Sequence, residues 1–324
     1  MKNITSWNKK KILITGASGF IGKNLIGSLL RKKSKIFVYV RNRHLFIKSL
    51  MSKEQIDLIT IIEGEITNLK KISRMIDKFS IQHIFHLAAN NENRALDCSP
   101  LEIIDTNLNG TLSIMEASLN KDSIKSIVLI SSKEVDRKDK LQSKKNIIHP
   151  YSASKLCTEI LAKSYIDNYK LPIIIVKFDN IFGEGDLNFN RLIPNLIKNL
   201  IENKSIKFKN KKNVFRGFIY IDDIIEVLER SIRNYSNIYS KNIITLNSLE
   251  LITTREVANR IAKILGSKEG LEFNKKSVSF KSRVMKKHTC FNRASSLAKL
   301  LKAEELSKNI NNVAKEFLND NSNS

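Results

Sequence analysis

A tyrosine and a lysine four residues apart mark the segment of this chain that is best suited to chemistry. Tyr151 and Lys155 follow Pro150 at the start of a predicted helix, so their side chains share one helix face. A phenol can donate or accept a proton, and a neighbouring ammonium favours its ionised form. The spacing predicts an acid/base pair. By itself it also fits an exposed helix face without a chemical role.

Two hydroxyl groups precede this helix. Ser131 and Ser132 end an apolar run, 125–131, that is typical of a buried strand. In open α/β sheets, ligands bind beyond the carboxyl ends of the strands. We therefore expect that a hydroxyl at this position can hydrogen-bond a substrate oxygen next to Tyr151.

A glycine turn opens the chain's first helical segment. Gly16, Gly19 and Gly22 directly follow the apolar run 11–15 and are three of only eleven glycines. Gly16 suits a tight turn, Gly19 admits a pyrophosphate to the backbone N–H groups, and Gly22 lets helix and strand pack closely. The helix N-terminus attracts phosphate. The alternative is a turn without a ligand, but this strand–turn–helix context predicts a dinucleotide site.

Strand and helix patterns alternate through the first half of the chain, which predicts a doubly wound parallel α/β sheet of the Rossmann type. Expected strands are 11–15, 35–40, 57–62, 82–88, 125–131 and 172–178, and expected helices are 20–31, 67–78, 101–119 and 151–169. A smaller, interleaved C-terminal lobe follows, with an expected helix near 191–202 and expected strands near 205–208 and 216–220. A further helix is expected over 254–265, where Thr253-x-x-Glu256 forms a capping box at its start and Gly266 ends it. A helical tail is expected over 294–319. The predicted domains are 1–178 with 212–248 for the dinucleotide, and 179–211 with 249–324 for the substrate.

The charge balance is strongly basic, with 56 Lys and Arg against 32 Asp and Glu and a net charge of +24. A nucleic-acid partner could explain it, but the cations are scattered over turns without interleaved aromatics. We expect no nucleic-acid partner, and an anionic small substrate would still benefit from the field. We find no signal peptide or apolar run of membrane-spanning length. The cysteines and histidines lack metal-ligand spacing, so we expect a cytoplasmic protein without a metal.

Taken together, these motifs resemble the extended short-chain dehydrogenase/reductase family, and within it the NAD(P)-dependent nucleotide-sugar epimerases, dehydratases and reductases. The matching segments are the glycine turn, His86-Leu87-Ala88-Ala89, Asn107-x-x-Gly110-Thr111, Tyr151-x-x-x-Lys155, Asn180-Ile181-Phe182-Gly183 and Arg216-Gly217-Phe218-Ile219-Tyr220-Ile221-Asp222-Asp223. The resemblance implies that Tyr151 is the general acid/base, that Lys155 holds the nicotinamide ribose and that Ser132 orients the substrate oxygen.

The resemblance extends to both ligand sites. The predicted cofactor site comprises Gly16, Ser18, Gly19, Phe20, Ile21, Gly22, Arg41, Glu65, Ile66, Leu87, Ala88, Ala89, Asn107, Tyr151 and Lys155. The predicted substrate site comprises Lys133, Glu134, Asn180, Arg191, Arg216 and Arg283. Gly185-Asp186 followed by Arg191-Leu192-Ile193-Pro194 looks most like the 4,6-dehydratases, notably those for CDP-glucose.

Several positions depart from the dehydratase pattern. An acidic residue usually follows the active-site hydroxyl, where this chain has Lys133 and then Glu134. Asp136-Arg137 stands in place of Tyr-Gly, Lys177 replaces an arginine, and Glu65 stands where an adenine-contacting aspartate is common. We therefore expect an epimerase or 4-keto reductase acting at C4 of a nucleotide-linked hexose. A 4,6-dehydratase is the alternative, and a catalytically weakened dinucleotide-binding regulator is the alternative of another class.

The cofactor and the assembly can also be predicted. NAD-binding folds place an acidic residue at the end of the second strand, where this chain has Val40-Arg41-Asn42-Arg43. An arginine can pair with a 2′-phosphate, so NADP(H) is expected, with NAD possible. The resemblance implies a homodimer that forms through the predicted helices 101–119 and 151–169.

Overall fold

The computed structural model describes most of the chain. The described residues are 7–49, 53–90, 99–136, 149–202, 204, 206–208, 215–233, 242–248, 250–265, 271–273 and 283–284. The contacts within the chain divide it into two compact units, Met1–Lys177 with Ile225–Thr245, and Phe178–Ile224 with Leu246–Ser324. The expected helical tail and the expected stop at Gly266 lie outside the described residues.

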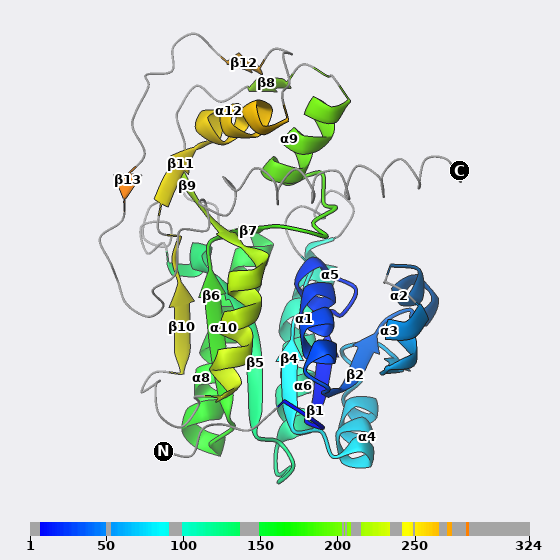
Figure 1. Ribbon diagram of the computed structural model, residues 1–324. Coiled ribbons are helices and arrows are strands. Elements are labelled where there is room, and N and C mark those ends of the chain that lie inside the picture. Colours follow the sequence, from blue (N-terminus) through cyan, green and yellow to red (C-terminus); the bar gives the residue numbers. More distant parts are fainter. Residues whose placement is uncertain are drawn as a thin grey trace, which may run out of the picture. The chain divides into compact units, whose positions relative to one another are not determined.

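The first unit is built on a seven-stranded sheet with the order β10-β6-β5-β4-β1-β2-β3 (Figure 1). Its strands are β1 (Lys11–Thr15), β2 (Lys35–Val40), β3 (Ile59–Glu63), β4 (His83–His86), β5 (Ser126–Ser132), β6 (Ile173–Phe178) and β10 (Ile243–Leu246). The pairings of β1 with β2 and β4, of β2 with β3 and of β4 with β5 are parallel. This is the strand order of a dinucleotide-binding Rossmann fold, and the predicted α/β class is confirmed.

Helices cover both faces of this sheet. They are α1 (Phe20–Arg31), α2 (Arg43–Ser49), α3 (Lys53–Asp57), α4 (Leu69–Phe79), α5 (Pro100–Ile104), α6 (Gly110–Ser118), α8 (Pro150–Tyr169) and α10 (Ile221–Arg233), together with the π-helical turn η2 (Asp105–Asn109) and the 3₁₀ turn η3 (Lys133–Asp136). On one face, Ser28 and Lys32 of α1 both bind Glu229 of α10. On the other face, α6 packs between α4 and α8.

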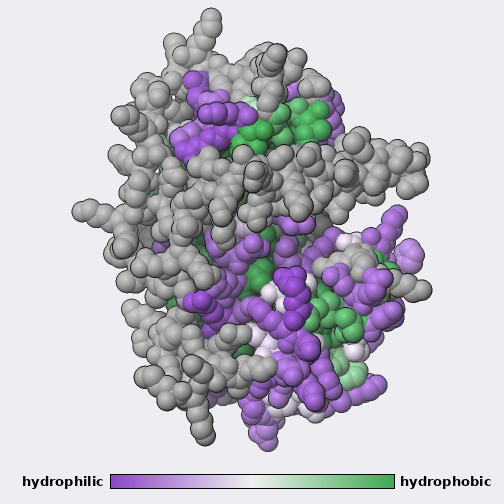
Figure 2. All heavy atoms as spheres, in the orientation of Figure 1, coloured by the Kyte–Doolittle hydropathy of each residue, from purple (hydrophilic) through white to green (hydrophobic). Residues whose placement is uncertain are grey.

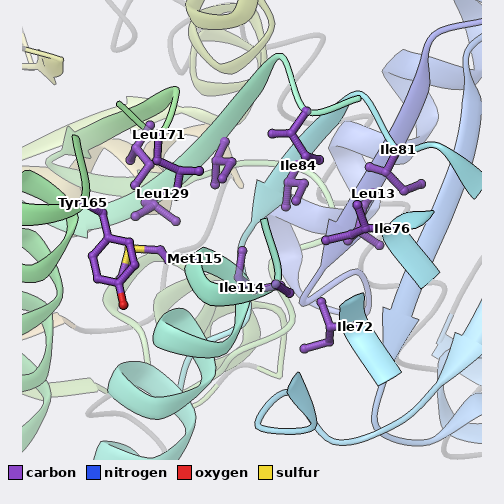
Figure 3. Close-up of a cluster of buried hydrophobic side chains, with 14 of the residues drawn as sticks. Leu13, Ile72, Ile76, Ile81, Ile84, Ile114, Met115, Leu129, Tyr165 and Leu171 are labelled. Atoms are coloured by element: carbon purple, nitrogen blue, oxygen red, sulfur yellow. The ribbon is translucent and has the colours of Figure 1, made fainter. Parts of the chain in front are cut away.

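The largest part of the core lies beneath α4, α6 and α8. Helix α4 shows the underlying pattern: Ile72, Met75 and Ile76 form one buried stripe, Asn68 caps its first turn, and Ser80 ends it in the left-handed conformation. Figure 3 shows how this stripe meets apolar side chains from the strands and from α6 and α8. Because these strands are buried on both sides, their sequences are nearly continuous apolar runs, and β1 to β6 lie within about three residues of their expected positions.

Within its described residues, the second unit contains two small sheets and two helices. Its elements are β7 (Asn180–Phe182), α9 (Leu192–Ile201), β8 (Ile206–Phe208), β9 (Phe215–Tyr220), β11 (Glu250–Thr253), α12 (Thr254–Ile264), β12 (Leu271–Phe273) and β13 (Arg283–Val284). One sheet has the order β13-β11-β9-β7, and the other pairs β12 with β8. Because β9 pairs with β7 and β11, the chain returns to the first unit at Ile225 rather than at the expected residue 212.

The described surface is mixed in hydropathy. On the described residues in Figure 2, hydrophilic and hydrophobic side chains both reach the visible surface. Among the described residues, no helix is both long enough and apolar enough to cross a membrane. Within the same residues, no group of three or more His, Cys, Asp or Glu side chains could hold a metal ion.

Candidate active site

The predicted cofactor residues follow the carboxyl ends of four neighbouring strands in the first unit. The glycine turn follows β1, Arg41 follows β2, Glu65 and Ile66 follow β3, and Leu87-Ala88-Ala89 follows β4. Ser132 ends β5, the next strand along. The carboxyl ends of parallel strands meet at one edge of the sheet, so residues that are distant in sequence are brought to the same edge.

The glycine turn is tight for reasons visible within the chain. Gly16 has a φ of +64°, and an added Cβ would lie 2.6 Å from the backbone nitrogen of Ala88. At Gly22 an added Cβ would lie 2.5 Å from the carbonyl oxygen of Gly16. Both positions therefore require glycine, one for the turn and one for the contact between helix and strand.

Gly19 differs from the other two glycines. It has a φ of −77°, which any residue can adopt, and an added Cβ would meet only the Gly16 carbonyl oxygen, at 3.2 Å. The N-terminus of α1 has no side-chain cap and no acidic residue in its first turn. The N–H groups and the positive dipole end of α1 therefore suit an anion, and the approach of such a ligand would explain why position 19 is a glycine.

The ends of β2 and β3 carry opposite charges. Arg41 is exposed. Arg43 is tied to the chain, because its guanidinium donates to the Ile61 carbonyl at 3.1 Å and its backbone N–H donates to Glu63 at 3.2 Å. Glu63 pairs in register with Val40, the last residue of β2. Sequence reasoning found no acid at the end of β2 and missed this one, because it comes from the neighbouring strand.

His86 is a buried imidazole whose partners define its protonation. The Thr111 hydroxyl donates to the Asn107 carbonyl at 2.6 Å, so it must accept the proton of His86 Nε2, which lies 3.0 Å away. Nδ1 then accepts from the Thr15 hydroxyl at 2.7 Å. Burial, reinforced by the charge of Lys155, lowers the pKa of His86 to about 3. The ring is therefore neutral and connects the end of β1 with the helix that carries Asn107.

Asn107 holds the start of α8. It lies in the π-helical turn η2, within a stretch that was expected to be one regular helix. Its amide nitrogen donates to the Ser154 hydroxyl and to the Asn90 carbonyl, both at 2.9 Å, and its side-chain oxygen accepts from the Asn90 N–H at 2.8 Å. The carbonyl of Asn107 also accepts from Thr158, at 3.3 Å. One buried side chain thus joins the loop after β4 to the helix of Tyr151.

Helix α8 turns a polar face towards the sheet. Of its six buried side chains, the first four in sequence are Ser154, Lys155, Thr158 and Glu159. Buried polar groups are costly unless they are hydrogen-bonded, and each of these four has a partner. Such a face is unfavourable for packing alone, which indicates a functional role.

Lys155 and Glu159 reach the last residues of β5. Lys155 Nζ donates to the Ile130 carbonyl at 2.9 Å, and the carboxylate of Glu159 accepts from the Ser131 hydroxyl. Ser131 is therefore bound inside the fold, whereas Ser132, the predicted catalytic serine, is half-buried. Burial lowers the pKa of Lys155 to about 8, and the Glu159 carboxylate acts in the opposite direction. Tyr151, one turn before Lys155, is also half-buried.

The remaining predicted substrate residues of the first unit follow β5. Lys133 begins η3 and is half-buried. Glu134 lies in the same turn, and its side chain is outside the described part. Lys177, where the resemblance led us to expect an arginine, is buried on β6 and pairs with Glu159 at 2.8 Å.

The second unit carries four predicted substrate residues. Asn180 is exposed and its amide donates to the Gly217 carbonyl at 2.9 Å, next to Arg216, which is also exposed. Arg191 pairs with Asp186 at 3.0 Å. Burial raises the pKa of Asp186, and Arg191 opposes this. Arg283 begins β13, which pairs with β11, and its side chain is outside the described part.

Sequence reasoning missed Glu159 and Glu63 and did not find the partners of His86. A signal for Glu159 existed, because it lies four residues after Lys155 and eight after Tyr151 and so falls on their helix face. Glu63 and the partners of His86 depend on which strands and helices are neighbours, which local spacing does not reveal.

Comparison with known proteins places these features in a family. Residues 12–246 match the sequence model of the NAD dependent epimerase/dehydratase family. A UDP-glucuronate 4-epimerase from Thermodesulfobacterium geofontis (strain OPF15) is 28% identical over 289 residues, which cover 82% of this chain and 85% of that protein. A dTDP-D-glucose 4,6-dehydratase from Dictyostelium discoideum is 29% identical over 259 residues, which cover 71% of this chain and 58% of that protein. The match thus spans little more than half of the Dictyostelium enzyme.

A solved structure has the same fold. The UDP-glucuronic acid 4-epimerase from Bacillus cereus, in complex with UDP-glucuronic acid and NAD, superposes with a TM-score of 0.68 at 24% sequence identity. The superposition covers 81% of this chain and 85% of the Bacillus chain.

Proposed function

Because the chain belongs to the NAD-dependent epimerase/dehydratase family, we propose that it transfers a hydride at C4 of a nucleotide-linked hexose, as an epimerase or a 4-keto reductase. The observation that carries this proposal is the hydrogen bond that anchors the start of α8. Asn107 binds Ser154 in the first turns of the helix, and this holds Tyr151 and the buried Lys155 at the edge of the sheet where Ser132 ends β5.

The residues at the sheet edge fit a nicotinamide dinucleotide. The uncapped N-terminus of α1 suits a pyrophosphate, and Gly19 leaves room for its approach. When bound, the nicotinamide supplies hydride exchange with the sugar. We propose that Lys155 holds the ribose next to the nicotinamide, and that Leu87, Ala88 and Ala89 line the approach to it.

The chain's own residues would move the proton. Tyr151 takes the proton from the C4 hydroxyl in oxidation and returns it in reduction. Ser132 binds the same oxygen and fixes its orientation. Lys133, Asn180, Arg191, Arg216 and the two residues whose side chains lie outside the described part, Glu134 and Arg283, are proposed to contact the nucleotide sugar. Arginine suits this role because its guanidinium can donate two parallel hydrogen bonds to one phosphate group.

A 4,6-dehydratase is the second candidate, since one relative catalyses that reaction. Elimination needs a base for the C5 proton and an acid for the departing C6 hydroxyl. Glu134 could serve as the base, but Lys133 stands where dehydratases have the acid. An ammonium is a weaker proton donor than a carboxylic acid. Epimerisation and 4-keto reduction need neither group, and the proposal favours them for this reason.

We expect no 4-keto-6-deoxy sugar from any UDP-, CDP-, GDP- or dTDP-hexose offered alone. The expected products are the C4 epimer, or the alcohol when a 4-keto sugar is supplied with NADPH. Product NMR distinguishes these outcomes. Inversion changes the couplings of the C4 proton, reduction of a 4-keto sugar creates a C4 proton, and a 4-keto-6-deoxy sugar has a C6 methyl group and no C4 proton.

Two results would decide between the candidates. Accumulation of a 4-keto-6-deoxy sugar would replace the proposal with the dehydratase. Tight binding of the nucleotide sugars and the dinucleotide without turnover would favour the catalytically weakened regulator. The Tyr151→Phe variant is the matched control, because it separates turnover at this site from a contaminating activity.

For the cofactor we propose NADP(H). The alternative is NAD(H), which the NAD complex of the Bacillus relative favours. Arg41 is exposed at the end of β2, where a guanidinium can pair with a 2′-phosphate. The nearby negative charge that would repel a 2′-phosphate is the Glu63 carboxylate, which accepts a hydrogen bond from the backbone N–H of Arg43. Glu65 and Ile66 follow β3 close by, and Tyr39 fixes the Glu65 carbonyl through a 3.1 Å hydrogen bond.

Calorimetry should give a lower Kd for NADPH than for NADH. Arg41→Ala should weaken NADPH about tenfold, the loss of one charge-assisted hydrogen bond of about 1.5 kcal/mol, and leave NADH unchanged. Lys48→Ala, which removes a cation from exposed α2 nearby in sequence, is the control for general charge loss. Equal or tighter binding of NADH would reverse the assignment.

The predicted homodimer and cytoplasmic location stay proposals. The dimer is supported by apolar side chains on the outside of α5 and α8, where Leu101 is 76% exposed and Ile160 is 60% exposed. These two helices pack against each other, so their exposed residues can form one surface.

A further inference from the structure

A row of three chemically active side chains runs along α8 towards the sheet interior. Tyr151, Lys155 and Glu159 are spaced four residues apart and share one face. Lys155 is 6% exposed and Glu159 is 4% exposed. The row therefore begins at the half-buried phenol and ends at a carboxylate that has been removed from water.

Glu159 is held between two strands. One carboxylate oxygen accepts from the Ser131 hydroxyl of β5, and the other binds the Lys177 ammonium of β6 at 2.8 Å. The side chains of both members of this ion pair are 6% exposed. A buried ion pair of this kind is weak support for stability, because the loss of hydration offsets much of the attraction. Stability alone therefore does not explain this ion pair.

The charges around Lys155 supply an explanation. Around Lys155, α8 itself carries the titratable residues Tyr151, Cys157, Glu159, Lys163, Tyr165, Asp167 and Tyr169. The described titratable side chains on the surrounding elements include His86 of β4, Glu102 of α5, Asp105 of η2, Glu116 of α6, Lys133 of η3 and Lys177 of β6. His86 is neutral because its pKa is lowered to about 3. Lys133 and Lys177 add positive charge. The other described carboxylates of this set, Glu102, Asp105, Glu116 and Asp167, are exposed to water. Glu159 is the buried one, and it raises the pKa of Lys155.

We propose that Glu159 is a positioning residue of the active site, which supplies the negative charge that keeps Lys155 protonated beside Tyr151, and that Lys177 moderates this charge. The role in turnover rests on the proposed function. The electrostatic linkage among Glu159, Lys177 and Lys155 does not, because it is a property of the folded chain alone. It can be measured without a substrate.

The experiment is a pH titration of Lys155 by NMR in protein labelled with ¹³C at the lysine ε-carbon. The Lys155 signal is identified by its loss in Lys155→Arg. It should titrate near pH 8, apart from exposed lysines near ~10.4. Glu159→Gln, whose amide oxygen can still accept from Ser131, should lower the midpoint by about 1 pH unit or more, since a nearby opposite charge shifts a pKa by about 1–3 units.

Removal of the positive charge of Lys177 should raise the titration midpoint of Lys155, which is opposite to the effect of Glu159→Gln. Lys177→Met leaves Glu159 with Lys155 as its nearest cation in the described set, so the midpoint should rise. Lys177→Arg keeps the charge and should leave it unchanged. The double variant Glu159→Gln/Lys177→Met should fall between the single variants. Damage to packing would not produce shifts of opposite sign.

An unchanged midpoint in Glu159→Gln, or shifts of the same sign in Glu159→Gln and Lys177→Met, would overturn the proposal. If Glu159→Gln does not fold, the rise in Lys177→Met and the constancy in Lys177→Arg still test it, and no rise would overturn it. Opposite shifts in a protein that turns over no nucleotide sugar would support the linkage and count against the proposed function alone.

Discussion

Replacement of Tyr151 with phenylalanine is expected to lower turnover about 100-fold or more while dinucleotide affinity stays nearly unchanged. Proton transfer by a positioned side chain contributes about 10²–10⁴ to the rate, and the substitution removes only the phenolic oxygen. The backbone at the start of α8 keeps a hydrogen bond that does not involve that oxygen, because the Ser154 hydroxyl donates to the backbone carbonyl of Tyr151 at 2.8 Å. Steady-state kinetics and calorimetry on the same preparation would measure both quantities.

The matched control is Tyr169→Phe at the other end of the same helix. Tyr169 is 60% exposed and lies at the last residue of α8, so the same chemical change there should leave turnover at the wild-type level. Turnover of Tyr151→Phe within a few-fold of wild type would show that another group moves the proton.

Replacement of Gly22 with alanine is expected to lower the free energy of unfolding by about 1–3 kcal/mol, the usual cost of overpacking, and to weaken dinucleotide binding as well. The added Cβ would lie 2.5 Å from the Gly16 carbonyl oxygen and 2.7 Å from that of Ala17. Both are backbone atoms, so relief requires α1 to move away from the glycine turn. Chemical denaturation and dinucleotide calorimetry would detect the two effects.

Gly27→Ala is the control for the second prediction. Gly27 lies in the middle of α1, where alanine is favoured over glycine by about 1 kcal/mol of helix propensity. The two substitutions are chemically the same and occur in one helix. Gly22→Ala should lower the free energy of unfolding because of the clash with the glycine turn, whereas Gly27→Ala should raise it through helix propensity. A stable Gly22→Ala variant with unchanged dinucleotide affinity would contradict the close packing of α1 on the turn.

The sheet of the first unit was predictable because buried parallel strands need continuous apolar runs. Strands β1 and β2 lie at their expected residues. The stretch expected as one helix over 101–119 is instead α5, the π-helical turn and α6. Apolar periodicity cannot show this, because a π-helical turn changes only the local hydrogen-bond register. That turn carries Asn107, which had been assigned to the site from the resemblance alone.

The candidate site was predictable where spacing along the chain carries the chemistry, as at Tyr151 and Lys155. It was not predictable where chemistry depends on residues that meet across the sheet. Glu159 and Lys177 come from neighbouring elements and are 18 residues apart in the chain. The short strands β10 and β11 also went unrecognised, because four residues each give too little pattern to distinguish a strand from a loop.

The interleaving of the two units has a consequence for biosynthesis. The outermost strand beside β6 is β10, which begins at Ile243, after the ribosome has already made residues 178–224 of the second unit. Until then the nascent sheet ends in β6, whose sequence Ile-Ile-Ile-Val-Lys-Phe is an apolar edge of the kind that pairs with other chains. Translation at about 5–20 residues per second leaves that edge open for seconds, a window in which a chaperone can act.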